Sequence, residues 1–336
     1  MKSEFLSHPR GKDSHERRAR SGSNWGVSIS ATRFSLKIQS NLYFRSLATN
    51  IYGSDARFIF ELLQNADDNR YTRARAARAD PFISFRVYPD RIIVECNEDG
   101  FTVEDLSAIC SVNKSTKSTS HGYIGAKGIG FKSVFIAASK VYIQSGYFSF
   151  LFKHSKGDSA LSMGLPIWKE PDEELPSPLT RMTLHLHEEG NQEKLKHSRQ
   201  NIYTQLSELQ QTCLLFLRNL KRIKVTFYNN DGKKTSSKAF STGSIDNHRV
   251  FFKTTTATPT SKTSTEMKCY HITRHLATGL PKSDNRDLPD TDDSHTNSSA
   301  SEVVLAFPLT TTSHPIVDGQ HIFAFLPIRH SSFKVK

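Results

Sequence analysis

The sequence predicts an α/β (α+β) protein, because helical and strand-like patterns alternate along most of its length. Apolar residues between positions 54 and 68 recur with the spacing of a helix. The next two runs, 82–88 and 91–97, are rich in β-branched and aromatic residues, and Pro89-Asp90 between them is typical of a hairpin turn. After residue 229 the pattern changes to short strand-like runs between polar stretches. The sequence therefore predicts a mixed unit followed by a partial second α/β segment.

The other elements follow the same two patterns. Thr102 and Asp105 have the spacing of a capping box at the start of a helix. Helices are expected at 35–48, at 102–110, from a glycine-rich turn to about 139, and at 191–219. Strands are expected at 141–145, 147–152, 181–187, 223–228, 250–253, 267–272, 303–307 and 321–326, with a loop at 155–178.

The chain divides into segments of different composition. Residues 1–34 are polar and rich in Ser and Arg, so we expect a flexible basic tail. Residues 35–228 carry the regular patterns and form the main predicted domain. Residues 229–336 are expected to form a partial, truncated segment, with a disordered insert at about 282–302.

Charge and cysteine content narrow the class of protein. The 336 residues include 45 Lys and Arg against 33 Asp and Glu, a net charge of +12. This balance suits a nucleic acid, an acidic membrane surface or a polyanionic ligand, but also a merely basic surface with basic tails. None of the 4 cysteines has metal-finger or redox spacing, which favours a reducing compartment. With no signal-peptide core or apolar span, we expect an intracellular protein, cytoplasmic or nuclear.

Three polar residues of the 54–68 helix share one face. Glu61, Asn65 and Asp68 lie at i, i+4 and i+7, beside an apolar arc that includes Leu62 and Leu63. A solvated face would explain such a stripe on its own. At the edge of a core-facing surface, however, two carboxylates and an amide are also candidates for binding or catalysis.

A glycine-rich turn lies at 124–135, directly before a predicted helix. Gly125, Gly128 and Gly130 would let backbone N–H groups approach a phosphate, and a helix N-terminus favours negative charge. The spacing is neither that of a P-loop nor that of a dinucleotide-binding turn. Close packing of a turn would also explain the glycines.

The stripe and the turn together could hold a nucleotide. Asn65 could supply an oxygen ligand to Mg²⁺, and Glu61, one turn earlier, could orient or deprotonate water. Lysines near the turn could neutralise phosphate charge, although each one alone is better explained as a solvated surface charge. They are Lys114, Lys117, Lys127 and Lys132.

The order of these motifs resembles the GHKL ATPase superfamily, which includes gyrase, the large heat-shock chaperone, histidine kinases and MutL. Within it, the chain is most similar to the sacsin and NO VEIN-like subgroup. The resemblance covers about residues 42–225 and extends faintly to 323–327. The matching stretches are FIFELLQNADD at 58–68, NEDGF at 97–101, STK at 115–117, the turn at 124–135 and LLFLRNLKRI at 214–223.

The resemblance implies a Bergerat-type fold: a mixed, mostly antiparallel sheet with helices on one face and ATP between the helices and the sheet. It implies that Glu61 activates water, that Asn65 binds Mg²⁺ and that Asp68 supports them. Residues 111–123 would form a lid over the nucleotide. The implied phosphate-contacting residues are Gly125, Gly128, Gly130 and Phe131, and Thr180 would lie near the adenine.

One motif departs from the superfamily pattern. In most members the aspartate of a D-x-G-x-G motif binds the adenine base. Aligning that motif on Gly100 places Cys96 at the aspartate and Glu98 at the first glycine. Asn97 or Asp99 could take over this contact, although neither is in register.

These observations predict an ATP-binding module with slow Mg²⁺-dependent hydrolysis that drives a chaperone-like conformational change. Its partners would be ATP and ADP, with protein clients or a dimer partner, and no membrane. The alternative is a non-catalytic scaffold with a degenerate nucleotide site. A histidine kinase is disfavoured because no phosphoacceptor helix precedes the Glu61 helix. Nucleic acid suits the charge, but no aromatic–basic module is recognisable in the sequence.

Overall fold

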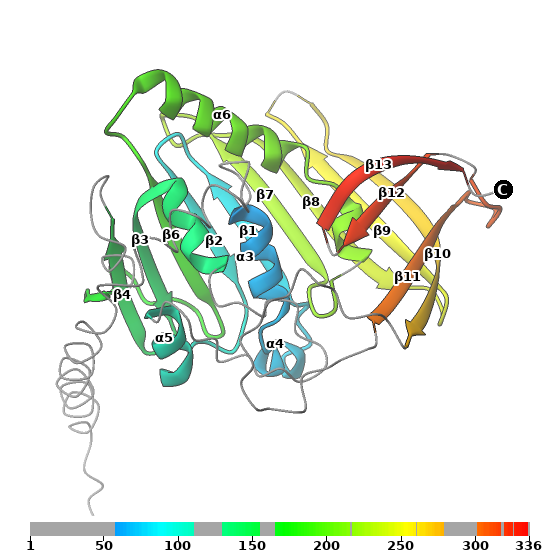
Figure 1. The fold of residues 1–336 in the computed structure, drawn as a ribbon, viewed down its shortest axis with the longest axis horizontal. Coiled ribbons are helices and arrows are strands. Elements are labelled where there is room, and N and C mark those ends of the chain that lie inside the picture. The colour runs from blue at the N-terminus through cyan, green and yellow to red at the C-terminus, as the bar shows by residue number, and fades with distance from the viewer. Residues whose placement is uncertain are drawn as a thin grey trace, which may run out of the picture.

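A large sheet organises the part of the chain that the structure describes (Figure 1). The structure is a computed structural model, and it describes residues 58–110, 130–154, 165–215, 217–259, 261–278, 301–316, 319–324 and 326–334. The sheet is 11-stranded, and a separate two-stranded hairpin follows it. Its strands are β1 (Phe82–Val87), β2 (Arg91–Cys96), β3 (Ala138–Ser145), β4 (Phe148–Lys153), β5 (Ile167–Trp168), β6 (Thr180–Leu186), β7 (Arg222–Tyr228), β8 (Lys234–Ser244), β9 (Arg249–Ala257), β10 (Ser264–Ala277) and β11 (Ser301–Leu309). The hairpin consists of β12 (Gly319–Ala324) and β13 (Leu326–Lys334).

The strand order is β11-β10-β9-β8-β7-β1-β2-β6-β3-β4-β5. Among the described strands β1 and β7 pair in parallel, and the other pairs are antiparallel. The predicted hairpin of β1 and β2 is confirmed, with Val87 opposite Ile92 next to the turn. The prediction of a mixed, mostly antiparallel sheet is therefore confirmed.

Helices α3, α5 and α6 lie on one side of the sheet (Figure 1). The helical elements are α3 (Phe58–Asp67), α4 (Thr72–Ala76), α5 (Val103–Cys110) and α6 (Gln192–Ser207), with the 3₁₀ helices η1 (Gly130–Ile136) and η3 (Gln211–Leu215). Burial alternates strictly along β1 and β2, so one face of each strand packs into the core and the other does not. The predicted capping box of α5 is confirmed, since Thr102 Oγ1 and Asp105 Oδ2 exchange bonds with each other's backbone N–H groups. No helix in the described part of the chain is long and apolar enough to span a membrane.

Two predicted helices are shorter than expected. The helix after the glycine turn was expected to reach about residue 139, but η1 ends at Ile136 and β3 begins at Ala138, because this segment pairs with β6. The helix expected at 191–219 ends as α6 at Ser207. Its end is set by tertiary contacts: Lys238 Nζ, from β8, donates to the carbonyl oxygens of Ser207 (3.5 Å) and Leu209 (3.2 Å). The expected helix at 35–48 lies outside the described residues.

Strand β8 was not predicted. Its sequence is dominated by Ser, Thr and Lys, and Phe240 is its buried large apolar residue. It forms because β7 pairs with it on one side and β9 on the other. Through these pairs the chain after residue 229 extends the same sheet that the preceding residues begin. A second unpredicted strand, β5, lies within the expected loop at 155–178.

Candidate functional site

Glu61, the first residue of the polar stripe, lies against the last glycine of the glycine-rich turn. Glu61 is half-buried, and a Cβ built on Gly130 would lie only 2.4 Å from Glu61 Oε2. Such a distance is too short for a real contact, so the absence of a side chain at Gly130 lets the Glu61 carboxylate sit against the start of η1. The structure thus brings together two candidate residues that are far apart in sequence.

Asn65 and Asp68 continue the stripe toward the end of α3. Asn65 is half-buried, and within the described ranges its side-chain amide has no hydrogen-bond partner. Asp68 lies just beyond the last residue of α3, half-buried, with its N–H donating to Gln64 O (3.0 Å). Glu61 and Asn65 thus lie one turn apart on α3, and Asp68 follows the last residue of that helix.

Phe131 and Lys132, which follow Gly130, both point into the core. The Phe131 ring contacts the rings of Phe135 and Phe152, with centroids 6.2 and 6.1 Å away. Lys132 is 5% exposed, and its Nζ donates to the carbonyl oxygen of Ile109 at the end of α5 (2.6 Å). Burial lowers the pKa of Lys132 to about 8. Lys132 thus ties η1 to α5, so it is not the solvated surface charge that the sequence suggested.

The turn after β2 carries the predicted adenine-reading residues, and their side chains bind backbone groups. Asn97 is buried; its Oδ1 accepts from Phe82 N–H (2.8 Å), and its Nδ2 donates to Asp80 O (3.0 Å). Asn97 therefore fastens the start of β1 to the end of β2. Cys96, at the position of the superfamily aspartate, is also buried, and burial raises the pKa of its thiol.

Asp99, although far from α4 in sequence, caps the N-terminus of that helix. Its carboxylate accepts from the N–H groups of Thr72 (3.0 Å) and Arg73 (2.8 Å) and from the Thr72 hydroxyl. Burial acts to raise the pKa of Asp99, but these hydrogen bonds outweigh it and lower the pKa below its usual value. The Asp99 N–H donates to Arg70 O (3.0 Å), so this turn lies against the chain segment that follows α3.

Thr180 and Gly100 meet at one buried cluster near Cys96. Thr180 is the strand partner of Cys96 across β2 and β6, and its hydroxyl shares a 2.5 Å hydrogen bond with Ser145. Ser145 Oγ also accepts from the N–H of Phe101 (2.8 Å). Gly100 has φ +93°, a conformation that favours glycine, and lies against the backbone of residue 146. The remaining predicted residues lie outside the described residues: Lys114, Lys117, Gly125, Lys127 and Gly128.

Asp67 is a polar residue of α3 that sequence reasoning missed. Its side chain is 1% exposed and accepts three backbone N–H groups at 2.8–2.9 Å, from Arg218, Asn219 and Leu220. Burial raises the pKa of Asp67, against the lowering effect of these three bonds. A signal was present in the sequence, because Asp67 continues the apolar positions 59 and 63 at i+4. An acid on an apolar stripe indicates a buried, specifically bonded carboxylate.

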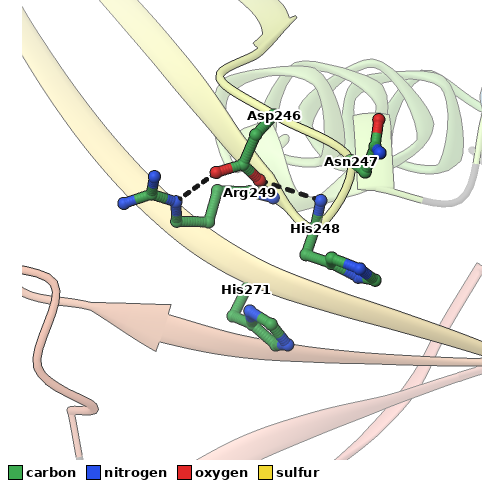
Figure 2. Close-up of a pocket in the computed structure, with 5 residues that line it drawn as sticks. All are labelled: Asp246, Asn247, His248, Arg249 and His271. Carbon is green, nitrogen blue, oxygen red and sulfur yellow. Dashed lines mark hydrogen bonds and ion pairs between the residues drawn. The ribbon is translucent and has the colours of Figure 1, made fainter.

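A hollow at the turn between β8 and β9 contains none of the predicted site residues (Figure 2). Asp246 closes the turn by accepting from the N–H groups of His248 (2.9 Å) and Arg249 (2.7 Å) and from Arg249 Nε (2.6 Å). The rings of His248 and His271 lie stacked 5.7 Å apart, as Figure 2 shows. In the described ranges, no three His, Cys, Asp or Glu side chains are grouped so that they could hold a metal ion.

Comparison with known proteins gives one partial relationship. No family model matches the chain. The chain is 40% identical, over 144 residues, to the Arabidopsis thaliana protein described as "Protein NO VEIN". The matched region is 43% of this chain and 5% of that protein, so the chain spans a small fraction of the length of the relative. The similarity to a NO VEIN protein is thereby shown for part of the chain.

Proposed function

We propose that this chain is an ATP-binding module with a Bergerat-type fold of the GHKL superfamily. In this proposal, slow Mg²⁺-dependent ATP hydrolysis drives a chaperone-like conformational change. The observation that carries the proposal is the approach of Glu61 to Gly130, since it joins the E-x-x-x-N helix to the end of the glycine-rich turn. The sheet with helices on one side and the partial similarity to a NO VEIN protein support it.

The donor groups on α3 fit a magnesium nucleotide. Mg²⁺ prefers oxygen ligands and keeps several of its waters, so the Asn65 amide oxygen would be a sufficient protein ligand beside phosphate oxygens. Glu61, one turn before it, would hold and orient a water molecule and accept its proton. Bound Mg-ATP would supply the reactive phosphoanhydride and a cation that neutralises its charge. The protein would hold Glu61 and Asn65 in fixed positions, because Phe58, Leu62 and Leu63 pack α3 into the core.

The base would be bound at the other end of this region, near Thr180. The Thr180 hydroxyl is already oriented by Ser145, and Gly100 keeps the adjoining turn free of a side chain. Asn97 is buried and bonded to backbone groups through both polar atoms of its side chain. In this proposal the partly exposed carboxylate of Asp99 would therefore be the acceptor for the adenine amino group.

A second candidate is a non-catalytic scaffold with a degenerate nucleotide site. The observation that favours it is at the turn after β2, where a buried neutral thiol, Cys96, occupies the position of the usual aspartate. A thiol is a weak hydrogen-bonding group and cannot replace a carboxylate as acceptor for the adenine amine. In this case the Glu61 helix would be retained for packing alone.

Calorimetric titration of the whole chain with Mg-ATP, combined with a phosphate-release assay, tests both candidates. We expect the wild type to bind, Asn65→Ala to lose the Mg²⁺-dependent part of the affinity, and Glu61→Ala to bind but release no phosphate. Asn201→Ala, a half-buried asparagine on α6, is the matched control and should behave as wild type. Absence of binding to the wild type would refute the ATP-binding module. Binding without release of phosphate by the wild type would favour the scaffold.

A further inference from the structure

A row of aromatic and basic side chains crosses the sheet at right angles to its strands. From β7 to β4 the row consists of Tyr228, Tyr88, Arg91, His185, Lys140 and Lys153. Arg91 is the strand partner of His185, His185 of Lys140, and Lys140 of Lys153. Tyr88 donates its N–H to Arg91 O (2.8 Å), and its ring stacks on that of Tyr228 with centroids 4.4 Å apart. We call these six residues the basic row.

The basic row lies on the face of the sheet opposite the helices. Neighbouring positions in the same strands, Ile92, Val141 and Leu184, are fully buried and belong to the core. Because side chains alternate between the two faces of a strand, the row points the other way. Lys153 is exposed, and Arg91, His185 and Lys140 are partly exposed. The row is therefore accessible from outside the molecule.

The charge of this face is predominantly positive. Within the basic row, Arg91 forms an ion pair with the carboxylate of Asp90 (2.9 Å). Both side chains remain more than a third exposed. Lys140 and Lys153 have no carboxylate within ion-pair distance among the described residues. On β7 and β9 the same face adds exposed cations: Arg222, Lys224 and Lys253.

Three acidic groups on this face, Glu95, Asp172 and Glu173, already pair with basic side chains, whereas the exposed Glu188 lies close enough to His185 to affect it electrostatically. Glu95 pairs with Arg86 and Arg181 (2.7 Å each), and Glu173 also pairs with Arg181. Asp172 pairs with Lys169, whose Nζ lies 4.3 Å from the centre of the Tyr142 ring. In these pairs the positive and negative charges cancel, so the net positive charge of this face comes mainly from the basic row.

A hollow of about 340 Å³ lies along the row. Arg91, His185 and Lys140 line it together with the apolar side chains of Ile93 and Leu151. Its two carboxylates, Asp172 and Glu173, are those paired with Lys169 and Arg181. The row and the hollow together offer cations beside apolar surface. This is the combination that a nucleotide chain, with charged phosphates and flat bases, can use.

We propose that this face binds single-stranded nucleic acid, with the phosphate backbone following the basic row across the sheet. At a strand spacing of about 4.8 Å, six strands carry the row over roughly 24 Å, which is long enough for several nucleotides. The aromatic end of the row is preorganised: Arg91 lies over the Tyr88 ring at 4.3 Å, and the ring stacks on Tyr228. An acidic protein is the competing partner. Its carboxylates would bind the cations of the row, but the stacked tyrosines would add little to its affinity. This proposal does not depend on the ATP site.

The sequence alone could not reveal this site, since its six residues come from five strands and the turn after β1, spread between positions 88 and 228. No local run of basic residues marks them. Only the register of the sheet places them in one line.

Fluorescence anisotropy of the whole chain with a labelled single-stranded dT₂₀ oligonucleotide tests the proposal. Neutralising two cations, in Lys140→Gln/Lys153→Gln, should weaken binding roughly tenfold at moderate salt. A plot of the logarithm of the association constant against the logarithm of salt concentration has a negative slope. The double substitution should make this slope less negative by about 1.4, at ~0.7 for each lost phosphate contact. The matched control is Lys194→Gln/Lys196→Gln, which removes the same charge from exposed positions on α6 and should leave the slope unchanged.

A second pair of variants tests the kind of partner. Tyr228→Leu should weaken binding of the oligonucleotide several-fold but leave binding of labelled polyglutamate unchanged, whereas Tyr147→Leu, at an 88% exposed tyrosine, should change neither. Equal loss from both lysine pairs, or no binding by the wild type, would overturn the proposal. Polyglutamate binding as tightly as the oligonucleotide, with Tyr228→Leu having no effect, would assign the face to an acidic protein.

Discussion

Asp67 and Asn219 bind each other through both side chain and backbone. Asn219 donates its N–H to Asp67 Oδ1 (2.8 Å) and its Nδ2 to the Asp67 carbonyl oxygen (2.7 Å). Asn219 Oδ1 also accepts from Arg75 Nη2 (2.6 Å), on α4. The end of α3, α4 and the turn before β7 are thus fixed to one another, and the orientation of the Glu61 stripe depends on this junction.

Asp67→Asn should destabilise the fold by about 3 kcal/mol. The amide keeps one acceptor oxygen but places an NH₂ group against backbone N–H donors, so buried donors lose their partner. Urea denaturation followed by circular dichroism measures the change. Asp231→Asn, in the exposed turn between β7 and β8, should change stability by less than about 0.5 kcal/mol. Equal stability of the two variants would contradict the structural role of Asp67.

Gly130→Ala should leave the fold nearly intact and displace the Glu61 carboxylate. The added Cβ would meet Glu61 Oε2 at 2.4 Å, and a carboxylate at the end of a flexible side chain can move away. We expect a stability change below about 1 kcal/mol. If Glu61 activates water as proposed, phosphate release by Gly130→Ala should fall at least tenfold. Wild-type phosphate release by Gly130→Ala would contradict a functional contact between Gly130 and Glu61.

Lys132 should make the protein more stable as the pH rises from about 8 to about 10.4. Burial lowers its pKa to about 8 in the folded protein, whereas the unfolded chain titrates near 10.4. In this interval the unfolded chain binds more protons, so the free energy of unfolding increases with pH, by an amount of order 2–3 kcal/mol.

Comparison of wild type with Lys132→Met isolates this effect from other titrating groups. Denaturation curves at about pH 7.5 and pH 9.5 should show a larger gain in stability for wild type than for the variant. Lys153→Met, at an exposed lysine, should behave as wild type. If the pH dependence of wild type and Lys132→Met were the same, the Lys132 amine would not be titrating in the folded core.

Asp99→Ala should destabilise the protein by about 1 kcal/mol near neutral pH, because α4 loses its cap. The pKa of Asp99 is lowered in the folded state, so its contribution is present above the unfolded pKa near 3.9 and disappears as the pH falls through the folded pKa. The difference between wild type and variant should therefore shrink between about pH 5 and pH 2. A difference that stayed constant over this range would show that the carboxylate charge does not cap α4.

The elements with strong local patterns could be predicted from the sequence. The β1–β2 hairpin and the α5 capping box depend on residues close in the chain, and both are confirmed. The alignment of Glu61 and Asn65 follows from helical spacing. By contrast, β8 has a polar sequence and forms only because strands pair on both of its sides. The bonds of Asp67 and Asp99 join residues that are far apart in sequence, and no local pattern specifies them.

The parallel contact of β1 with β7 has a consequence for how this protein can be handled. β7 is hydrogen-bonded to β1 on one side and to β8 on the other. A fragment that ended near residue 228 would turn β7 into an open edge strand with an exposed ladder of N–H and C=O groups, which invites intermolecular strand addition. The segment up to β7 should therefore be expressed together with β8 and the strands that follow. Fragments ending at β7 should form soluble aggregates detectable by light scattering.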